Sequence, residues 1–325
     1  MNKMIGAVVI GRNEGDRLAV CLQSLLVQVD TLVYVDSGST DHSLEIAEKL
    51  AVTVVNLDIS IPFTAARARN EGFAKLMQVS PDIQYVQFVD GDCEVFSDWL
   101  PQALPCLMEN EKLAVVCGQR KERYPEKSVY NRLCDIEWDT PVGEALTCGG
   151  DALIRAAAFD GVGGYDASLI AGEEPEMCVR LRNSGWKISR IDAEMTWHDA
   201  NMTDFSQWWK RAARSGHAYA EGAWMHGQTS QKHWVREVRR NWFWGLSFPV
   251  LIMVSAIWPT MVFLLLIYPI QVFRIYRHSN VHRDFKDRSA FAFFCVLANL
   301  PIMFGQIKFH SNRLMGSKSQ LIEYK

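Results

Sequence analysis

Two carboxylates at a spacing of two, those of Asp90 and Asp92, are the strongest sign of chemistry in this sequence. They flank Gly91 directly after residues 85–89, whose β-branched and aromatic side chains predict a buried strand. Ligands of open α/β sheets bind beyond the carboxyl ends of strands, and Gly91 lets the backbone approach such a ligand closely. Two hard oxygen ligands at this place suit Mg²⁺ or Mn²⁺ held against substrate phosphates. The alternative is an Asp-Gly turn that only ends the strand.

The surrounding sequence predicts the elements that bring this turn to the edge of a sheet. Apolar runs predict strands, separated by stretches with helical spacing, over residues 4–10, 31–35, 53–57, 83–89 and 113–118. The alternation predicts right-handed βαβ units and a Rossmann-like, mostly parallel sheet in an open α/β/α sandwich. Neither residues 11–15 nor the glycine-rich stretch 161–164 fits the Gly-x-Gly-x-x-Gly pattern that follows a strand in dinucleotide-binding proteins. A nicotinamide or flavin enzyme is therefore disfavoured.

Composition excludes several other classes. The formal net charge of the 325-residue chain is −3, which gives no footprint of nucleic-acid binding. Most of the 8 cysteines precede residue 240, and none forms a Cys-x-x-Cys pair. A disulfide scaffold or a zinc site is therefore not expected, and a reducing cytosol is the simpler setting. The apolar run near the N-terminus is too short for a signal-peptide core and predicts a first strand instead.

Two stretches without a formal charge, residues 242–273 and 289–307, distinguish the end of the chain. We therefore expect a soluble, catalytic part over about residues 1–235 and membrane-associated helices over about 236–325. Basic residues flank both stretches on every side, at Lys232, Arg236, Arg239, Arg240, Arg274, Arg277, Arg283, Lys286, Arg288, Lys308, Arg313, Lys318 and Lys325. The positive-inside tendency favours one face for all of them, as re-entrant hairpins or in-plane helices. A buried soluble core or a dimer interface is the alternative.

In the order and spacing of its motifs the chain resembles glycosyltransferase family 2, which has the GT-A fold, over residues 8–14, 35–41, 90–92 and 172–186. It looks most like bacterial enzymes that build exopolysaccharide or cell-surface glycans. The resemblance implies transfer of a sugar from a nucleotide-sugar, UDP- or other NDP-linked, to an acceptor hydroxyl with inversion at C1. With the apolar tail, it implies a lipid-linked (polyprenyl) glycan acceptor at the cytoplasmic face of the inner (plasma) membrane.

The resemblance assigns a set of residues to donor binding, namely Arg12, Asn13, Glu14, Asp36, Arg67, Asn70, Asp90 and Asp151. Asp36 matches the first acid of the family's Asp-Asp-Gly-Ser loop, and Ser37 replaces the second. Because of this replacement, the identity of the donor's nucleobase stays open. The alternative is a purely structural role for several of these residues. In that interpretation Asn13 stabilises a turn, Asp36 and Asp151 cap helices, and Arg67 and Asn70 lie on a solvated helix face.

The same resemblance assigns the metal ligands and the general base. Asp90 contacts ribose or metal, Asp92 ligates the metal, and His198 is a further metal ligand or else a core or capping histidine. Glu173 and Glu174 stand in place of the family's Glu-Asp pair, and Pro175 predicts that a helix begins there. A carboxylate at this position takes the proton of the attacking hydroxyl. Glu174 matches the catalytic acid by position, and Glu173 stays open as the alternative.

Residues 205–216 predict an amphipathic helix with a Gln-x-x-Lys-Arg order instead of the Gln-x-x-Arg-Trp of processive relatives. Arg211 and Arg214 are expected to neutralise the diphosphate of the donor, or else to face anionic lipid headgroups. Two further classes stay open. One is a nucleotidyltransferase with a similar sheet, and the other is a membrane scaffold with a degenerate site. The oligomeric state is left open.

Overall fold

The computed structural model describes residues 4–279 and 284–317, so that Arg283, Lys318 and Lys325 of the basic flanks lie outside the described residues. The chain forms two compact units. The sheet unit comprises Met1–Arg123 and Trp138–Ala200, and the helical unit comprises Tyr124–Glu137 and Asn201–Lys325. This division differs from the expected boundary near residue 235, which stays a prediction of where membrane association begins.

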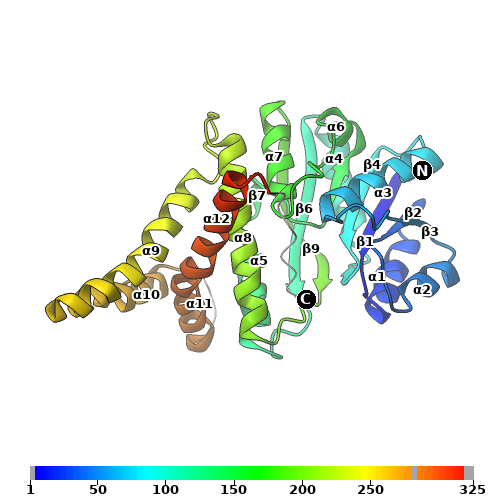
Figure 1. Cartoon of the computed structure of the whole chain (residues 1–325). Helices are drawn as coiled ribbons and strands as arrows, with labels where there is room; N and C mark the ends of the chain where they lie inside the picture. Colours follow the sequence, from blue (N-terminus) through cyan, green and yellow to red (C-terminus); the bar gives the residue numbers. More distant parts are fainter. Residues whose placement is uncertain (1–3, 280–283, 318–325) are drawn as a thin grey trace. The chain divides into compact units, whose positions relative to one another are not determined.

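The sheet unit is built on one mixed sheet (Figure 1) with the strand order β3-β2-β1-β4-β8-β6-β9-β5, and β7 pairs with β9. The strands are β1 (Ile5–Gly11), β2 (Thr31–Asp36), β3 (Thr53–Asn56), β4 (Tyr85–Asp90), β5 (Cys93–Val95), β6 (Leu113–Glu122), β7 (Gly143–Glu144), β8 (Ala152–Arg155) and β9 (Lys187–His198). The predicted α/β fold is confirmed. Strands β3, β2, β1 and β4 run parallel, as expected, whereas β8 is antiparallel to both β4 and β6.

Helices in the connections between strands bury one apolar face each, and they are α1 (Asp16–Leu26), α2 (Ser43–Lys49), α3 (Ala65–Val79), α4 (Trp99–Glu109), α6 (Ala156–Gly161) and α7 (Glu173–Asn183). Thr64 caps α3 by accepting from the backbone N–H of Arg67 at 3.1 Å. Gly72 lets α3 lie close to the sheet, because a Cβ there would stand 2.4 Å from Cγ1 of Val8. The approach brings the polar side chains of α3 to the strand ends.

The core of the sheet unit contains an aromatic cluster below the ends of the strands. Phe88 of β4 lies 5.1 Å from Phe159 and 5.7 Å from Tyr165, measured between ring centroids. Trp99 is fully buried, and its indole N–H donates to Oε1 of Gln87 at 2.8 Å. The strand that carries Asp90 is therefore fixed on both sides by packed rings and a satisfied polar pair.

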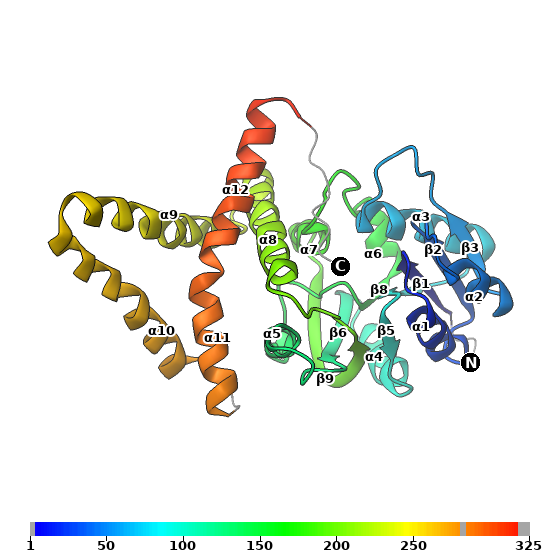
Figure 2. The same cartoon turned by 60° about the horizontal axis from the view of Figure 1, so that its bottom comes forward.

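The helical unit contains α8 (Phe205–His226), α9 (Val235–Ile257), the 3₁₀ helix η1 (Pro259–Leu266), α10 (Ile267–His278), α11 (Phe285–Leu297) and α12 (Asn299–Leu314), with most of α5 (Val129–Trp138). In Figure 2, α12 runs alongside α8. Glycines permit this contact. A Cβ on Gly305 would stand 1.9 Å from the carbonyl oxygen of Ala213, and one on Gly216 would stand 2.0 Å from that of Ile302.

Among the described residues, two stretches are long and apolar enough to cross a membrane, Pro259–His278 and Phe285–Leu314. In their most apolar windows, 0% of the first stretch and 39% of the second is buried within the chain. Pro249 lies inside α9, while Pro259 begins η1 after α9 has ended, so the apolar run 242–273 bends at Pro259. These stretches are candidate membrane-associated segments, and their number of spans stays a prediction.

The α8–α12 contact predicts a stability effect. Gly305→Ala places a methyl group against the backbone of α8, and we expect it to lower the free energy of unfolding by about 1–3 kcal/mol. Gly161→Ala is the control, because nothing lies within 4 Å of a Cβ at that position. Thermal unfolding of the detergent-solubilised protein measures both. Equal midpoints for Gly305→Ala and wild type would show that the helices are not in close contact.

Candidate active site

The ends of three parallel strands place the predicted acidic turn. Asp90 ends β4 and pairs with Ile10 of β1, and Gly11 pairs with Asp36 at the end of β2. The backbone N–H of Gly91 donates to the carbonyl of Ile10 at 2.8 Å. A Cβ on Gly91 would stand 3.1 Å from that same oxygen, so the turn needs glycine to lie this close to β1.

A buried chain of ion pairs surrounds Asp90. Oδ1 of Asp90 lies 2.6 Å from Nη2 of Arg69, and Nη1 of Arg69 lies 2.8 Å from Oε1 of Glu173. On the other side, Nη2 of Arg120 lies 3.8 Å from Oδ2 of Asp90 and 2.7 Å from Oδ2 of Asp151. The chain runs from Glu173 through Arg69, Asp90 and Arg120 to Asp151. It links α7, α3, β4 and β6 with the residue that precedes β8.

Mutual attraction keeps Asp90 and its two arginines charged. Burial alone acts to raise the pKa of Asp90, but Arg69 and then Arg120 outweigh it and hold that pKa below its usual value. Burial acts to lower the pKa of Arg69, and Asp90, Tyr165 and Glu173 together raise it above its usual range. Asp90 is therefore a fixed anion whose side chain remains 29% exposed.

Asp151, a predicted donor ligand, is 0% exposed. Its Oδ1 accepts from the backbone N–H of Asp90 at 3.1 Å, and its Oδ2 accepts from the hydroxyl of Thr196 at 2.9 Å and lies 2.7 Å from Nη2 of Arg120. These contacts support the acidic turn from within. Its assignment to donor binding stays a prediction.

Asp92 and His198 form the second part of the site. Strand β5 pairs with the end of β9 so that Cys93 lies opposite His198, and Nε2 of His198 lies 3.4 Å from Oδ1 of Asp92. Ligand atoms of Asp92, Cys93 and His198 all lie within 4.8 Å of one another. Burial raises the pKa of the Cys93 thiol well above its usual range, so Cys93 is a neutral thiol beside Asp92 and His198.

The donor set of Asp92 and His198 fits Mg²⁺ or Mn²⁺. Carboxylate oxygen and imidazole nitrogen are ligands that Mn²⁺ accepts, and Asp90, two residues before Asp92, has a side chain that is 29% exposed. Nδ1 of His198 is buried and has no hydrogen-bond partner among the described residues, while Oε2 of Glu122 lies 4.0 Å away. Metal-ligating histidines commonly donate their other ring N–H to a carboxylate, and Glu122 is the carboxylate on that side of His198. The ring of Trp138 packs edge-on against His198 at 4.7 Å.

The two acids of α7 point to different partners. Helix α7 begins at Glu173 after Gly172, which has φ of 80°, so Pro175 is not its first residue as the sequence predicted. Glu173 pairs with Arg69. Oε1 of Glu174 accepts from the backbone N–H of Cys148 at 2.5 Å and from the thiol of Cys178 at 3.1 Å. Glu174 is thus fixed on the loop before β8, and Glu173 is fixed on the acidic turn.

Cys148, Cys178 and Glu174 form a second group of neighbouring ligand atoms, with the two sulfurs 3.7 Å apart. The hydrogen bond between the two sulfurs, together with burial, raises the pKa of Cys148 well above its usual range. Burial also raises the pKa of Cys178. Both side chains are therefore neutral thiols beside Glu174.

Asp36 and Asn13 are predicted donor residues, and their contacts shape two facing loops. Asp36 is buried and accepts from the backbone N–H groups of Gly38 and Ser39 at 2.9 and 2.8 Å. Asn13 has φ of 58°, and its side-chain oxygen accepts from the N–H of Thr40 at 2.7 Å. The contacts match the turn-stabilising alternative for Asn13, and donor contact by either residue stays a prediction.

The structure does not bring all the predicted donor residues to the acidic turn. Arg67 donates to the carbonyls of Asp58 and Ile61 and pairs with Glu71. Asn70 exchanges two hydrogen bonds with the backbone of Tyr165, at 2.7 and 2.9 Å.

The remaining predicted donor residues lie at the β1 loop or in the other unit. Arg12 stacks on Phe63 at 4.7 Å, and Glu14 pairs with Arg17 at 2.7 Å. Arg211 pairs with Glu137 at 2.7 Å and, with Arg214, belongs to the helical unit. Donor binding by these residues stays a prediction.

Sequence reasoning missed two arginines of the site. Arg69 lies on the same face of α3 as Phe73 and Leu76, so a charge on the buried face was the available signal. Arg120 and Glu122 alternate along the last residues of β6, beyond the strand end expected at residue 118. Charged residues that continue the alternation of a buried strand indicate a polar site at its end.

A model of the family described as glycosyl transferase family 2 matches residues 7–147. The O-antigen chain rhamnosyltransferase RfbN of Salmonella typhimurium is 23% identical over 189 residues, which is 54% of this chain and 58% of that protein. This chain therefore matches less than two thirds of that relative's length. Glycosyltransferase AglE of Haloferax volcanii is 25% identical over 227 residues, 66% of this chain and 71% of that protein.

A solved structure shows the same fold. The mannosyltransferase PcManGT of Pyrobaculum calidifontis, in complex with GDP-Man and Mn²⁺, has a TM-score of 0.67 and 14% sequence identity. The likeness covers 95% of this chain and 88% of that chain. The predicted GT-A fold and the resemblance to glycosyltransferase family 2 are thereby confirmed.

The ion-pair chain predicts a strong stability effect at Arg120. Arg120→Ala leaves the buried Asp151 without its cation, and we expect a loss of about 3–5 kcal/mol in the free energy of unfolding. Lys121→Ala is the matched control. Its ion pair with Glu194 is on the surface, with side chains 36% and 45% exposed, so its loss costs about 0–1 kcal/mol. Chemical denaturation of the full chain compares them, and similar losses for both variants would refute the buried network.

Proposed function

We propose that the protein, whose residues 7–147 match the model of glycosyl transferase family 2, is a metal-dependent, inverting enzyme that transfers a sugar from a nucleotide-sugar to an acceptor hydroxyl. The observation that carries this proposal is the convergence of Asp90, Asp92 and His198 at the carboxyl ends of the strands, where Arg69 joins Asp90 to Glu173 of α7. Ligands of open α/β sheets bind at this edge.

The acidic turn is proposed to hold the leaving group. Asp92 and His198, with Asp90, would hold Mg²⁺ or Mn²⁺, which when bound stabilises the negative charge that develops on the departing diphosphate. Arg69 and Arg120 keep Asp90 ionised and fix its orientation. Support comes from PcManGT, whose structure holds GDP-Man and Mn²⁺.

The proton of the acceptor is proposed to pass to Glu174. As the acceptor oxygen attacks C1, its O–H bond breaks, and the electron pair of the C1–O bond leaves with the diphosphate. Glu173 is engaged in an ion pair with Arg69, whereas Glu174 accepts from two neutral donors, the Cys148 N–H and the Cys178 thiol. Glu174 is therefore the better candidate base, and Glu173 positions the start of α7 against the acidic turn.

The acceptor is proposed to be a lipid-linked (polyprenyl) glycan at the cytoplasmic face of the inner membrane. Two apolar stretches with basic flanks support membrane association, and the positive-inside tendency supports this face. The relative RfbN is an O-antigen chain rhamnosyltransferase, which suits a role in surface-polysaccharide synthesis.

Removal of the metal ligand tests the donor site. Asp92→Ala is expected to abolish Mn²⁺-dependent binding of the best nucleotide-sugar, because the ion loses its carboxylate. Titration calorimetry over a panel of nucleotide-sugars, with Mn²⁺ and with a chelator, measures the effect. Asp98→Ala is the control, since Asp98 is an exposed acid just before α4. Unchanged binding in Asp92→Ala would remove the metal role.

Paired glutamine variants test the base. Glu174→Gln is expected to keep donor affinity and to lower kcat by about 10²–10⁴-fold, the range of general-base catalysis. Glu173→Gln breaks the ion pair with Arg69 and is expected to weaken donor binding, with a smaller loss in kcat. Transfer assays on membranes with a labelled donor and a lipid extract measure both. A larger fall in kcat for Glu173→Gln would reverse the assignment, and pyrophosphate release from a nucleoside triphosphate would identify a nucleotidyltransferase.

A further inference from the structure

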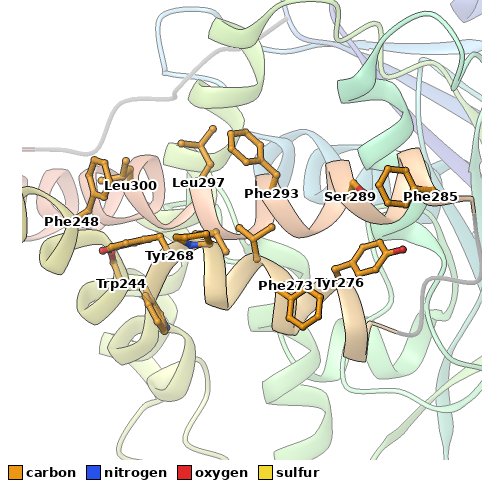
Figure 3. A pocket seen from close by; sticks show the side chains of 13 residues that line it. Trp244, Phe248, Tyr268, Phe273, Tyr276, Phe285, Ser289, Phe293, Leu297 and Leu300 are labelled. Carbon is orange, nitrogen blue, oxygen red and sulfur yellow. The ribbon is translucent and has the colours of Figure 1, made fainter. Parts of the chain in front are cut away.

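An apolar groove runs between helices of the helical unit. Figure 3 shows aromatic side chains along it, from Trp244 and Phe248 of α9, Tyr268 and Phe273 of α10, and Phe285 and Phe293 of α11. Its volume is about 680 Å³, within the range of sites for small organic ligands. Phe273, Phe285 and Phe293 are 61%, 72% and 52% exposed, so the groove is open at its apolar wall.

A second cavity, of about 380 Å³, adjoins the groove and shares Trp244 and Val296 with it. Its lining is different in character, since it includes Arg240, Asn241 and Gln271. Asn241 is 1% exposed, and its Nδ2 has no hydrogen-bond partner in the part of the chain that the structure describes. A buried amide that lines a cavity without a partner lacks an acceptor that a ligand would supply.

The charges around this polar cavity favour an anion. Arg240 contributes a positive charge, and Glu137, which also lines the cavity, is neutralised by Arg211 at 2.7 Å. Asn241 and Gln271 add amide donors. One arginine with two amides suits a phosphate group better than a neutral headgroup.

Apolar groove and polar cavity together fit an amphiphile with one long chain and an anionic head. We propose that the helical unit binds a polyprenyl phosphate lipid, with its chain in the groove and its phosphate at Arg240, Asn241 and Gln271. This inference rests on the proposed function, because it names where the acceptor's carrier lipid is held. Most of the groove's length comes from α10 and α11, which belong to the candidate membrane segments. A chain therefore enters it from the bilayer without crossing water.

Photo-crosslinking of the full chain in nanodiscs tests this site. The probe is a long-chain polyprenyl phosphate with a diazirine in its chain, and peptide mapping locates the labelled residues. We expect labelled residues in α9, α10 and α11 around the groove. Unlabelled polyprenyl phosphate is expected to prevent this labelling at a concentration at least ten times lower than phosphatidylglycerol requires. Inorganic phosphate is expected not to compete, because it lacks the chain.

Two variants with a matched control sharpen the test. Leu297→Trp fills the groove, and Asn241→Leu removes the amide while it keeps the size of the side chain; each is expected to reduce labelling at least tenfold. Leu264→Trp is the control, because Leu264 is 46% exposed and does not line the groove. Equal labelling in Leu297→Trp and Leu264→Trp would overturn the site.

The remaining outcomes are decisive as well. Equal competition by phosphatidylglycerol would identify a general phospholipid site, and labelling only at residues away from the groove would show that the groove does not hold the chain. Either result overturns the proposal. Mn²⁺-dependent nucleotide-sugar binding is measured on the same samples. If the wild-type protein binds the nucleotide-sugar but shows no specific lipid labelling, this inference fails and the proposed function stands. If the wild-type protein shows neither, the proposed function itself is rejected.

Discussion

The ion pair between Arg69 and Asp90 is the contact on which the candidate site depends. The guanidinium of Arg69 also pairs with Glu173, and Arg120 extends the ion pairs from Asp90 to Asp151. Residues far apart in sequence are thereby fixed around one carboxylate. A buried charge without its partner is costly, so the network is stable only when every member is present. The arrangement joins the turn that is proposed to hold the leaving group with the helix that carries the proposed base.

Local signals in the sequence identified much of this arrangement. The apolar run before Asp90 and the glycine after it predicted both the strand and the turn, because strand propensity and turn chemistry act over a few residues. Long-range features were less accessible. Helical spacing showed that Arg67 and Asn70 share a face of α3, but it does not show which face meets the site, and Arg69 is the residue that does. Strand β8, four residues long and antiparallel, lies between β4 and β6. Such a short strand carries little periodicity of its own.

The helical unit shows a different relation between sequence and structure. Its apolar stretches and basic flanks were evident from composition, whereas the division of the chain was not. Residues 124–137 belong to the same unit as the C-terminal helices. Ser128 and Asn131 hold this segment in the helical unit through hydrogen bonds with the backbone of Met202. Glycines at the α8–α12 contact bring the two backbones together, as small residues do between helices in membranes. The apolar groove is lined mainly by α9, α10 and α11.

The claim that the acidic turn is a metal–diphosphate site is tested most directly by anomalous diffraction from crystals grown with Mn²⁺ and a nucleoside diphosphate. The account predicts a manganese peak at Asp92 and His198, next to Asp90, with the diphosphate bound to the same ion. A peak at Cys148, Glu174 and Cys178 instead, or a diphosphate bound away from the acidic turn, would contradict it.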